Sequence, residues 1–178
     1  MEELFKSISE KISSYNIFNN LFPGIIFCSI LSKTTRFSIS SNNILEQLFL
    51  WYFVGMIISR IGSILVESTL KKIKFKKRPY LVFADYKQYI AASRANPFII
   101  TLSETNNTYR TIIALLLSLS VVYFYDIFLF DWVEEKCVIG NKLTIIIIGI
   151  LLIILFVKSY KKQSDYVRKQ VEKYVNEQ

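Results

Sequence analysis

Charged residues beside apolar stretches are the positions where this sequence most plainly points to chemistry. Arg60 lies near the end of the apolar stretch 44–66, and Glu67 follows it seven residues later. A charge at the centre of a membrane helix costs about 3 kcal/mol, so such residues are functional candidates. Seven residues return a helix to nearly the same face. We therefore expect Arg60 and Glu67 to be coupled directly, through water or through a common group on another helix.

A second polar group precedes the apolar stretch 111–130. It comprises Asn106, Asn107, Tyr109 and Arg110, and Glu104 precedes it as a candidate partner of Arg60. The first interpretation of this group is a boundary at the lipid headgroups, and the alternative is a hydrogen-bonded latch between spans or subunits. Arg60 also has two interpretations. In the first, its side chain extends to the lipid headgroups or forms an ion pair, and so stabilises the helix bundle. In the second, its charge forms part of a gate.

Small residues recur every four positions on one side of the stretch 44–66. They are Gly55, Ser59 and Ser63. This small-xxx-small pattern lets another helix approach closely. It predicts a packing surface, either within the chain or between subunits.

Acidic residues lie near the expected outer ends of two apolar stretches. Glu46 begins one stretch, and Asp126 and Asp131 end another. Carboxylates ring the mouths of cation channels. The pattern is consistent with solvated acids at the interface or with an outer acidic mouth in an oligomer.

Six basic residues are concentrated within eight positions, and they are Lys71, Lys72, Lys74, Lys76, Lys77 and Arg78. Basic segments beside a membrane bind anionic lipid, at about 1 kcal/mol per charge. We expect this cluster to contact membrane lipid. The alternatives are an anionic nucleotide and a contact with nucleic acid or protein, and a nucleic-acid partner is the less expected of these.

Several kinds of chemistry are disfavoured by composition. The 178 residues include no histidine, two cysteines and five glycines. This excludes histidine acid–base chemistry, and it leaves too few cysteines for a structural zinc site and too few glycines to favour a phosphate-binding loop. We expect no enzymatic activity, no cofactor and no metal.

The elements that carry these residues are apolar helices. Hydrophobic residues make up 52% of the chain, and the mean hydropathy is +0.35. Because a membrane-crossing helix needs roughly 20 apolar residues, the sequence predicts an all-α, four-helix transmembrane bundle with helical cytoplasmic extensions. The predicted spans are 17–32, 44–66, 111–130 and 143–157.

Three further segments complete the predicted organisation. Residues 1–16 are expected to form an amphipathic helix at the membrane interface, which is favoured over a cleaved signal peptide. Residues 67–110 form a basic cytoplasmic helical segment, and 158–178 form a cytoplasmic C-terminal helix. Asn96 and Pro97 resemble a helix start, which predicts a continuous helix over 97–130.

The distribution of lysine and arginine sets the predicted orientation. Seventeen of the 22 basic residues fall on the side of the termini and the middle loop, and four fall on the other side. Cytoplasmic loops carry the excess of positive charge. We expect an inner-membrane protein with both termini in the cytoplasm.

One pattern resembles a group of known proteins over residues 20–112. It consists of Pro23–Phe27, Arg60–Ser63, Glu67, Tyr86, Tyr89, Asn96–Pro97, Glu104, Asn106–Asn107 and Tyr109–Arg110. It looks like small, functionally uncharacterised bacterial multi-pass membrane proteins. In size and architecture the chain also resembles membrane effectors of anti-phage systems. The resemblance implies that Arg60, Glu67 and 106–110 form one constellation.

Three classes of function follow. The first is an oligomeric membrane effector or channel-like protein that responds to a cytoplasmic cue. The second is a non-catalytic membrane anchor or assembly subunit that docks a cytoplasmic protein. An enzyme or transporter is the third, and it is disfavoured because catalytic motifs and internal repeats are not found.

Overall fold

The computed structural model describes residues 14–75, 77–136 and 140–176. Its helices, π-helical turns (η) and strands are, in chain order, α2 (Ser14–Asn16), η1 (Ile17–Leu21), α3 (Phe22–Thr34), α4 (Ile44–Ile61), η2 (Gly62–Val66), α5 (Glu67–Lys72), β1 (Lys74–Phe75), β2 (Arg78–Pro79), α6 (Tyr86–Ala95), α7 (Phe98–Phe124), η3 (Tyr125–Leu129), α8 (Phe130–Lys136) and α9 (Gly140–Asn176). Most of the predicted interfacial helix 1–16, together with Lys76, lies outside the described residues.

Among the described residues, three helices are long and apolar enough to cross a membrane. They span Ile44–Lys72, Phe98–Leu129 and Thr144–Glu172. The mostly helical structure confirms the all-α prediction. The N-terminal helix formed by α2, η1 and α3 is not among the three, and its apolar run is interrupted by Asn19 and Asn20. A fourth span therefore stays a prediction.

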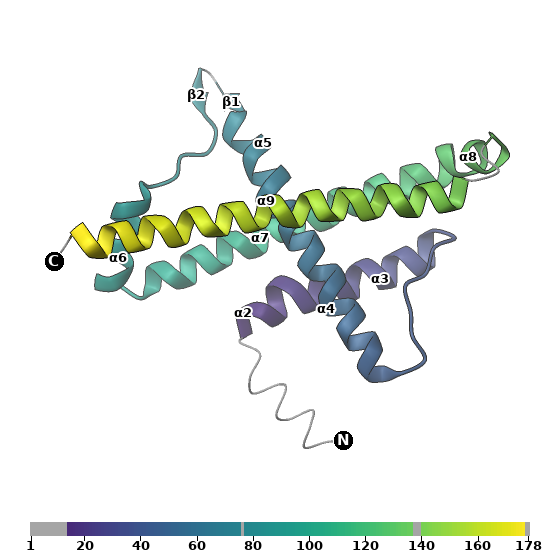
Figure 1. Ribbon diagram of the computed structural model, residues 1–178, viewed down its shortest axis with the longest axis horizontal. Coiled ribbons are helices and arrows are strands. Elements are labelled where there is room, and N and C mark those ends of the chain that lie inside the picture. Colours follow the sequence, from purple (N-terminus) through teal and green to yellow (C-terminus); the bar gives the residue numbers. More distant parts are fainter. Residues whose placement is uncertain (1–13, 76, 137–139, 177–178) are drawn as a thin grey trace.

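The long helices are not arranged as a parallel bundle. In Figure 1, α7 and α9 both extend along the long axis of the molecule, and the continuous helix α4–η2–α5 crosses them obliquely. The buried core forms where α3, α4 and α7 meet, and it includes Leu31, Ile58 and Ala114. Helix α9 is joined to the rest mainly through α4, η2 and α8.

Capping residues explain where several helices begin. The side chain of Asn43 accepts hydrogen bonds from two backbone amides at the start of α4. Asp85 accepts from the amide of Lys87 at the start of α6. Asn96 accepts from the amide of Phe98, 3.1 Å away, at the start of α7. Each cap satisfies an amide that the helix itself leaves unpaired.

The prediction that 67–110 is helical is wrong for residues 73–75 and 77–85. Helix α5 ends at Lys72, and β1 and β2 form a short antiparallel hairpin in which Lys74 is opposite Pro79. Lys77 has a φ of 67°, in the left-handed region. Closely spaced like charges disfavour a helix, and proline restricts the residue before it to extended backbone. The described residues of the basic cluster beyond Lys72 therefore lie outside any helix.

The expected helix over 97–130 is present, because α7 continues through η3 into α8. This continuity gives a test. Asn106→Pro should lower the free energy of unfolding by about 3 kcal/mol or more, because proline in a helix interior removes a hydrogen bond and clashes with the preceding turn. Thermal unfolding in detergent would measure the change. The control is Asn106→Ala, since Asn106 is exposed. Equal melting temperatures for the two variants would contradict a helix that supports the fold here.

Candidate functional site

A buried carboxylate with three cationic partners is the most concentrated group of charges in the described structure. Glu67 is the first residue of α5 and is 8% exposed. One of its oxygens lies 2.6 Å from the ammonium of Lys71. The other lies 2.5 Å from the guanidinium of Arg110 and 3.1 Å from the ammonium of Lys162. We call these four residues the Glu67 cluster. It joins α5, α7 and α9.

The small residues of η2 let these helices approach Glu67. A Cβ atom on Gly62 would lie 3.1 Å from the carbonyl oxygen of Arg110, so a larger residue would push α7 outward. On the other side, Lys162 donates to the carbonyl and the hydroxyl oxygens of Ser63, at 3.1 and 2.9 Å. The cluster is thus positioned by close contact between η2 and its two neighbouring helices.

The cluster carries more positive than negative charge. Three cations share one carboxylate, and the buried Nε of Arg110 has no hydrogen-bond partner among the described residues. Buried ion pairs contribute little net stability compared with apolar residues of the same shape, yet removing one partner is costly. Such a group is suited to fixing one arrangement of helices, and a competing anion or cation could change that arrangement.

A network of uncharged polar residues lies beside the core. The amide nitrogen of Asn19 donates to the hydroxyl of Ser59 at 2.8 Å, and the hydroxyl of Thr111 donates to the amide oxygen of Asn19 at 2.8 Å. Asn20 donates to the hydroxyl of Tyr52 at 3.3 Å. These bonds join η1, α4 and α7. Because the polar groups are satisfied by one another, they can be buried without a large desolvation cost.

All three π-helical turns carry buried polar residues. Asn19 and Asn20 belong to η1, Ser63 to η2 and Asp126 to η3, and each of these residues is buried. A π turn has i→i+5 bonding, which shifts the register of the side chains, and such turns are frequent at functional sites. Here the register shifts coincide with the polar contacts between helices.

The far end of the molecule, near α8, has its own ion pairs. Arg36 follows α3, and its Nε lies 2.7 Å from Asp126, whereas one of its terminal nitrogens lies 2.7 Å from Asp131. The two carboxylates, Asp131 first, raise the pKa of Arg36. Its guanidinium also lies 4.2 Å from the ring centre of Phe130.

The outer acidic mouth predicted for an oligomer stays a prediction, and within one chain two of its three acids contact Arg36. Asp126 and Asp131 are both paired with Arg36, and Asp126 is buried. Glu46 accepts a hydrogen bond from the hydroxyl of Ser41 at 2.6 Å, near the start of α4. Arg36 offsets one of the two negative charges of Asp126 and Asp131, and the side chain of Asp131 remains 70% exposed.

The predicted constellation of six residues is brought together only in part. Glu67 and Arg110 are in direct contact, and the backbone carbonyl of Asn107 accepts from Thr111 in the polar network. Among the described residues, Arg60 forms no ion pair, so a direct pair with Glu67 is wrong. The turn η2 lies between them, and its shifted register means that seven residues no longer return to the same face. Glu104 is half-buried and Asn106 is exposed, and neither side chain contacts Glu67.

The small-residue series makes close contacts within the chain. A Cβ atom on Gly55 would lie 1.6 Å from the backbone oxygen of Asn20, and one on Gly24 would lie 1.7 Å from that of Trp51. The backbones of α4 and the N-terminal helix are therefore in direct contact. Ser59 and Ser63 continue the series toward Asn19 and Lys162.

The basic cluster divides into two parts. Lys71 belongs to the Glu67 cluster and also lies 4.3 Å from the ring centre of Phe83. The other described members of the basic cluster are exposed, and they are Lys72, Lys74, Lys77 and Arg78. Their exposure leaves them accessible to an anionic surface.

Sequence reasoning missed three residues that the structure brings into these sites. Lys162 appeared only as part of a charged tail, Arg36 only as an outer basic residue, and Asn19 only as part of a weak span. Two adjacent asparagines in an apolar stretch are a recognisable sign of a buried network. Nothing local could indicate Lys162, because its partner Glu67 is 95 residues away.

The described residues include no group of three or more His, Cys, Asp or Glu side chains that could hold a metal ion. Comparison with known proteins gives no relative: no protein family, curated protein or solved structure matches this chain. The function must therefore be inferred from the geometry alone.

Proposed function

We propose that this protein is an oligomeric membrane effector, channel-like in action, whose membrane helices respond to a cue on the cytoplasmic side. The observation that carries this proposal is the Glu67 cluster, in which cations from α5, α7 and α9 meet on one buried carboxylate. A change in any one of these ion pairs alters how three helices are held together. A cytoplasmic signal could act on the membrane helices by this route.

The proposed orientation places this cluster at the cytoplasmic surface. The excess of basic residues on the side of both termini and of the middle loop supports it. In a four-span arrangement, the N-terminal helix through α3 crosses the bilayer, although it is shorter and more polar than the other three. The membrane is then the bacterial inner membrane, and the α8 end faces outward.

The exposed apolar surface of α9 is available for contacts between copies of the chain. In an apolar segment of 18 residues in this helix, only 6% of the residues are buried. The corresponding share in the helix Ile44–Lys72 is 33%. Its exposed side chains include Ile146, Leu151 and Ile154. Lipid and further copies of the chain can both cover this surface. The backbones of α3 and α4 are in direct contact, which leaves no room for ions between these two helices. We therefore place the conducting path between copies of the chain.

A membrane anchor that docks a cytoplasmic protein is the second candidate. It is favoured by the contact between α6 and α9, where the rings of Tyr86 and Tyr166 stack with their centres 5.3 Å apart. The hydroxyl of Tyr86 also donates to the carbonyl of Tyr166 at 3.4 Å. A structured layer of helices beyond the membrane gives a partner protein a fixed surface, and this role needs no conduction.

Ion flux separates the two candidates. Purified protein in liposomes should release a trapped ion faster than empty liposomes do. Glu67→Gln should change the rate, because it removes the charge that holds the three cations while it keeps the side chain's shape. The control is Glu104→Gln, since Glu104 forms no ion pair among the described residues. Flux no faster than from empty liposomes, for both the wild type and Glu67→Gln, would contradict the channel-like function and favour the anchor.

A further inference from the structure

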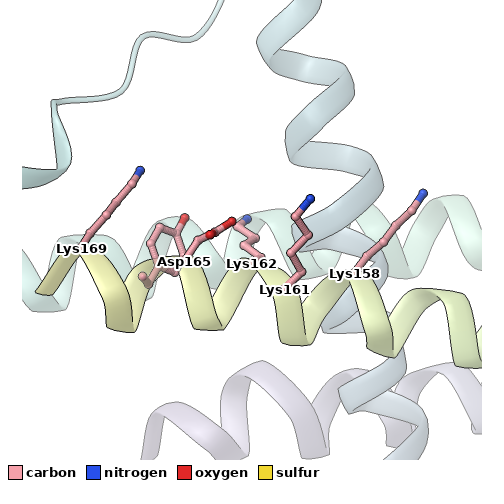
Figure 2. A pocket seen from close by; sticks show the side chains of 6 residues that line it. Lys158, Lys161, Lys162, Asp165 and Lys169 are labelled. Atoms are coloured by element: carbon pink, nitrogen blue, oxygen red, sulfur yellow. The ribbon is translucent and has the colours of Figure 1, made fainter. Parts of the chain in front are cut away.

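A pocket lined mainly by lysine lies on α9, next to the Glu67 cluster. Its volume is about 300 Å³, and it is lined by Lys158, Lys161, Lys162, Asp165, Tyr166 and Lys169. We call it the basic pocket. In Figure 2, Lys158, Lys161 and Lys169 extend from the same side of α9. The spacing of three and four residues explains this, since such positions share one face of a helix.

We propose that the basic pocket binds a phosphate group, carried either by a lipid or by a soluble compound, and that this phosphate is the cue for the Glu67 cluster. The role of this phosphate as the cue rests on the proposed function. The binding site itself is argued only from the charges and positions that follow.

The local charge calls for an anion. The basic pocket and the Glu67 cluster contain only two carboxylates, Glu67 and Asp165. They contain six cationic side chains, and these are Lys71, Arg110, Lys158, Lys161, Lys162 and Lys169. Neither Lys158 nor Lys161 pairs with an acid among the described residues, and Asp165 lies 3.5 Å from Arg168 instead. Bound phosphate would offset this mutual repulsion.

The chemistry of the lining residues favours phosphate over a carboxylate or a flat apolar ligand. Four lysines supply compact charges with three donors each, which can adjust to tetrahedral oxygens from several directions. The aromatic wall is Tyr166, held in place by its stack on Tyr86. The ammonium of Lys169 lies 5.8 Å from the ring centre of Tyr86, so it stays next to this wall.

The position of the pocket fits both sources of phosphate. Lys158 directly follows the apolar run that ends at Val157, so it lies at the depth of lipid headgroups if α9 spans the membrane. Lys169 lies about 16 Å further along the helix, which is beyond that depth. A lipid headgroup would use the Lys158 end, and a soluble phosphate could bind at either end.

Lys162 provides the link to the Glu67 cluster. It lines the basic pocket, and its ammonium contacts both Glu67 and the oxygens of Ser63. A phosphate in the pocket competes with Glu67 for this ammonium. Occupancy would therefore weaken the contact that holds α9 against η2, while Arg110 and Lys71 keep Glu67 paired.

The binding test uses two probes and two matched variants. Pyrophosphate is titrated into the full-length protein in a phosphate-free maltoside detergent, and phosphatidic acid is titrated in parallel against phosphatidylcholine. The first variant carries Lys158→Gln, Lys161→Gln and Lys169→Gln, which leave the Glu67 cluster intact. The control carries Lys33→Gln, Lys87→Gln and Arg94→Gln, which remove the same charge from exposed positions on α3 and α6.

We expect saturable binding of at least one probe, weakened about tenfold or more in the pocket variant and changed less than about twofold in the control. Pyrophosphate binding identifies a soluble phosphate as the ligand, and binding of phosphatidic acid alone identifies a lipid headgroup. No binding of either probe, or equal losses in both variants, would overturn the proposal.

The liposome flux assay distinguishes a failure of the phosphate-binding proposal from a failure of the proposed channel-like function. Flux that responds to Glu67→Gln, with no phosphate binding, removes the phosphate cue and leaves the channel-like function in place. Phosphate binding that depends on the pocket, in a protein without flux, keeps the site and removes the channel-like function.

Discussion

Glu67→Ala is expected to lower the free energy of unfolding by about 3–5 kcal/mol. The substitution removes the only carboxylate in contact with the ammonium of Lys162 and the guanidinium of Arg110 among the described residues. The side chains of these two residues are only 26% and 20% exposed, so their charges are left partly desolvated. Lys71 is more exposed and can be solvated by water. Thermal unfolding in detergent would measure the loss.

A matched acid and a double-mutant cycle sharpen this prediction. Glu104→Ala should change stability by no more than about 0.5 kcal/mol, because Glu104 forms no ion pair among the described residues. Glu67→Ala and Arg110→Ala should be less harmful together than the sum of the two, since the double variant leaves one fewer unpaired charge. Equal losses for Glu67→Ala and Glu104→Ala, or strictly additive losses with Arg110→Ala, would show that the cluster is not a unit.

Gly55→Ala should destabilise the protein by about 3 kcal/mol or more. The added methyl carbon would lie 1.6 Å from the backbone oxygen of Asn20, so α4 and the N-terminal helix would have to move apart. Moving them apart also stretches the hydrogen bond from Asn19 to Ser59, which is 2.8 Å long. Loss of folded protein in the membrane and a lower melting temperature in detergent are the expected results.

Gly149→Ala is the matched control for this substitution. A Cβ atom on Gly149 would meet nothing within 4 Å, and Gly149 lies within α9. Alanine is preferred over glycine in a helix by about 1 kcal/mol, so this variant should be neutral or more stable. If Gly55→Ala is as stable as Gly149→Ala, the close contact between the two backbones does not exist in the membrane.

Local features were predictable from the sequence. The apolar stretches mark three membrane-length helices, because length and hydropathy depend on neighbouring residues alone. Asp85 and Asn96 mark the starts of α6 and α7, because a cap bonds to amides two or three residues further on. The absence of the predicted helix between α5 and α6 also has a local cause, because closely spaced like charges and the proline at the end of β2 disfavour a helix there.

The partners of the charged residues could not be predicted in this way. The expectation for Arg60 and Glu67 assumed a regular α-helix, and η2 breaks that regularity between them. The small-residue series was predicted as a packing surface, but its partner, the backbone of Asn20, follows only from how two helices cross.

The sequence by itself determined that this chain is mainly helical, where its apolar helices lie and which segments carry the positive charge. Only the tertiary structure decided that Glu67 pairs with Arg110 and Lys162 and that Arg36 pairs with Asp126 and Asp131. These partners are between 43 and 95 residues apart in the chain. Helix formation depends on bonds within a few residues, whereas a charge pairs with whatever group the crossing of helices brings within about 4 Å.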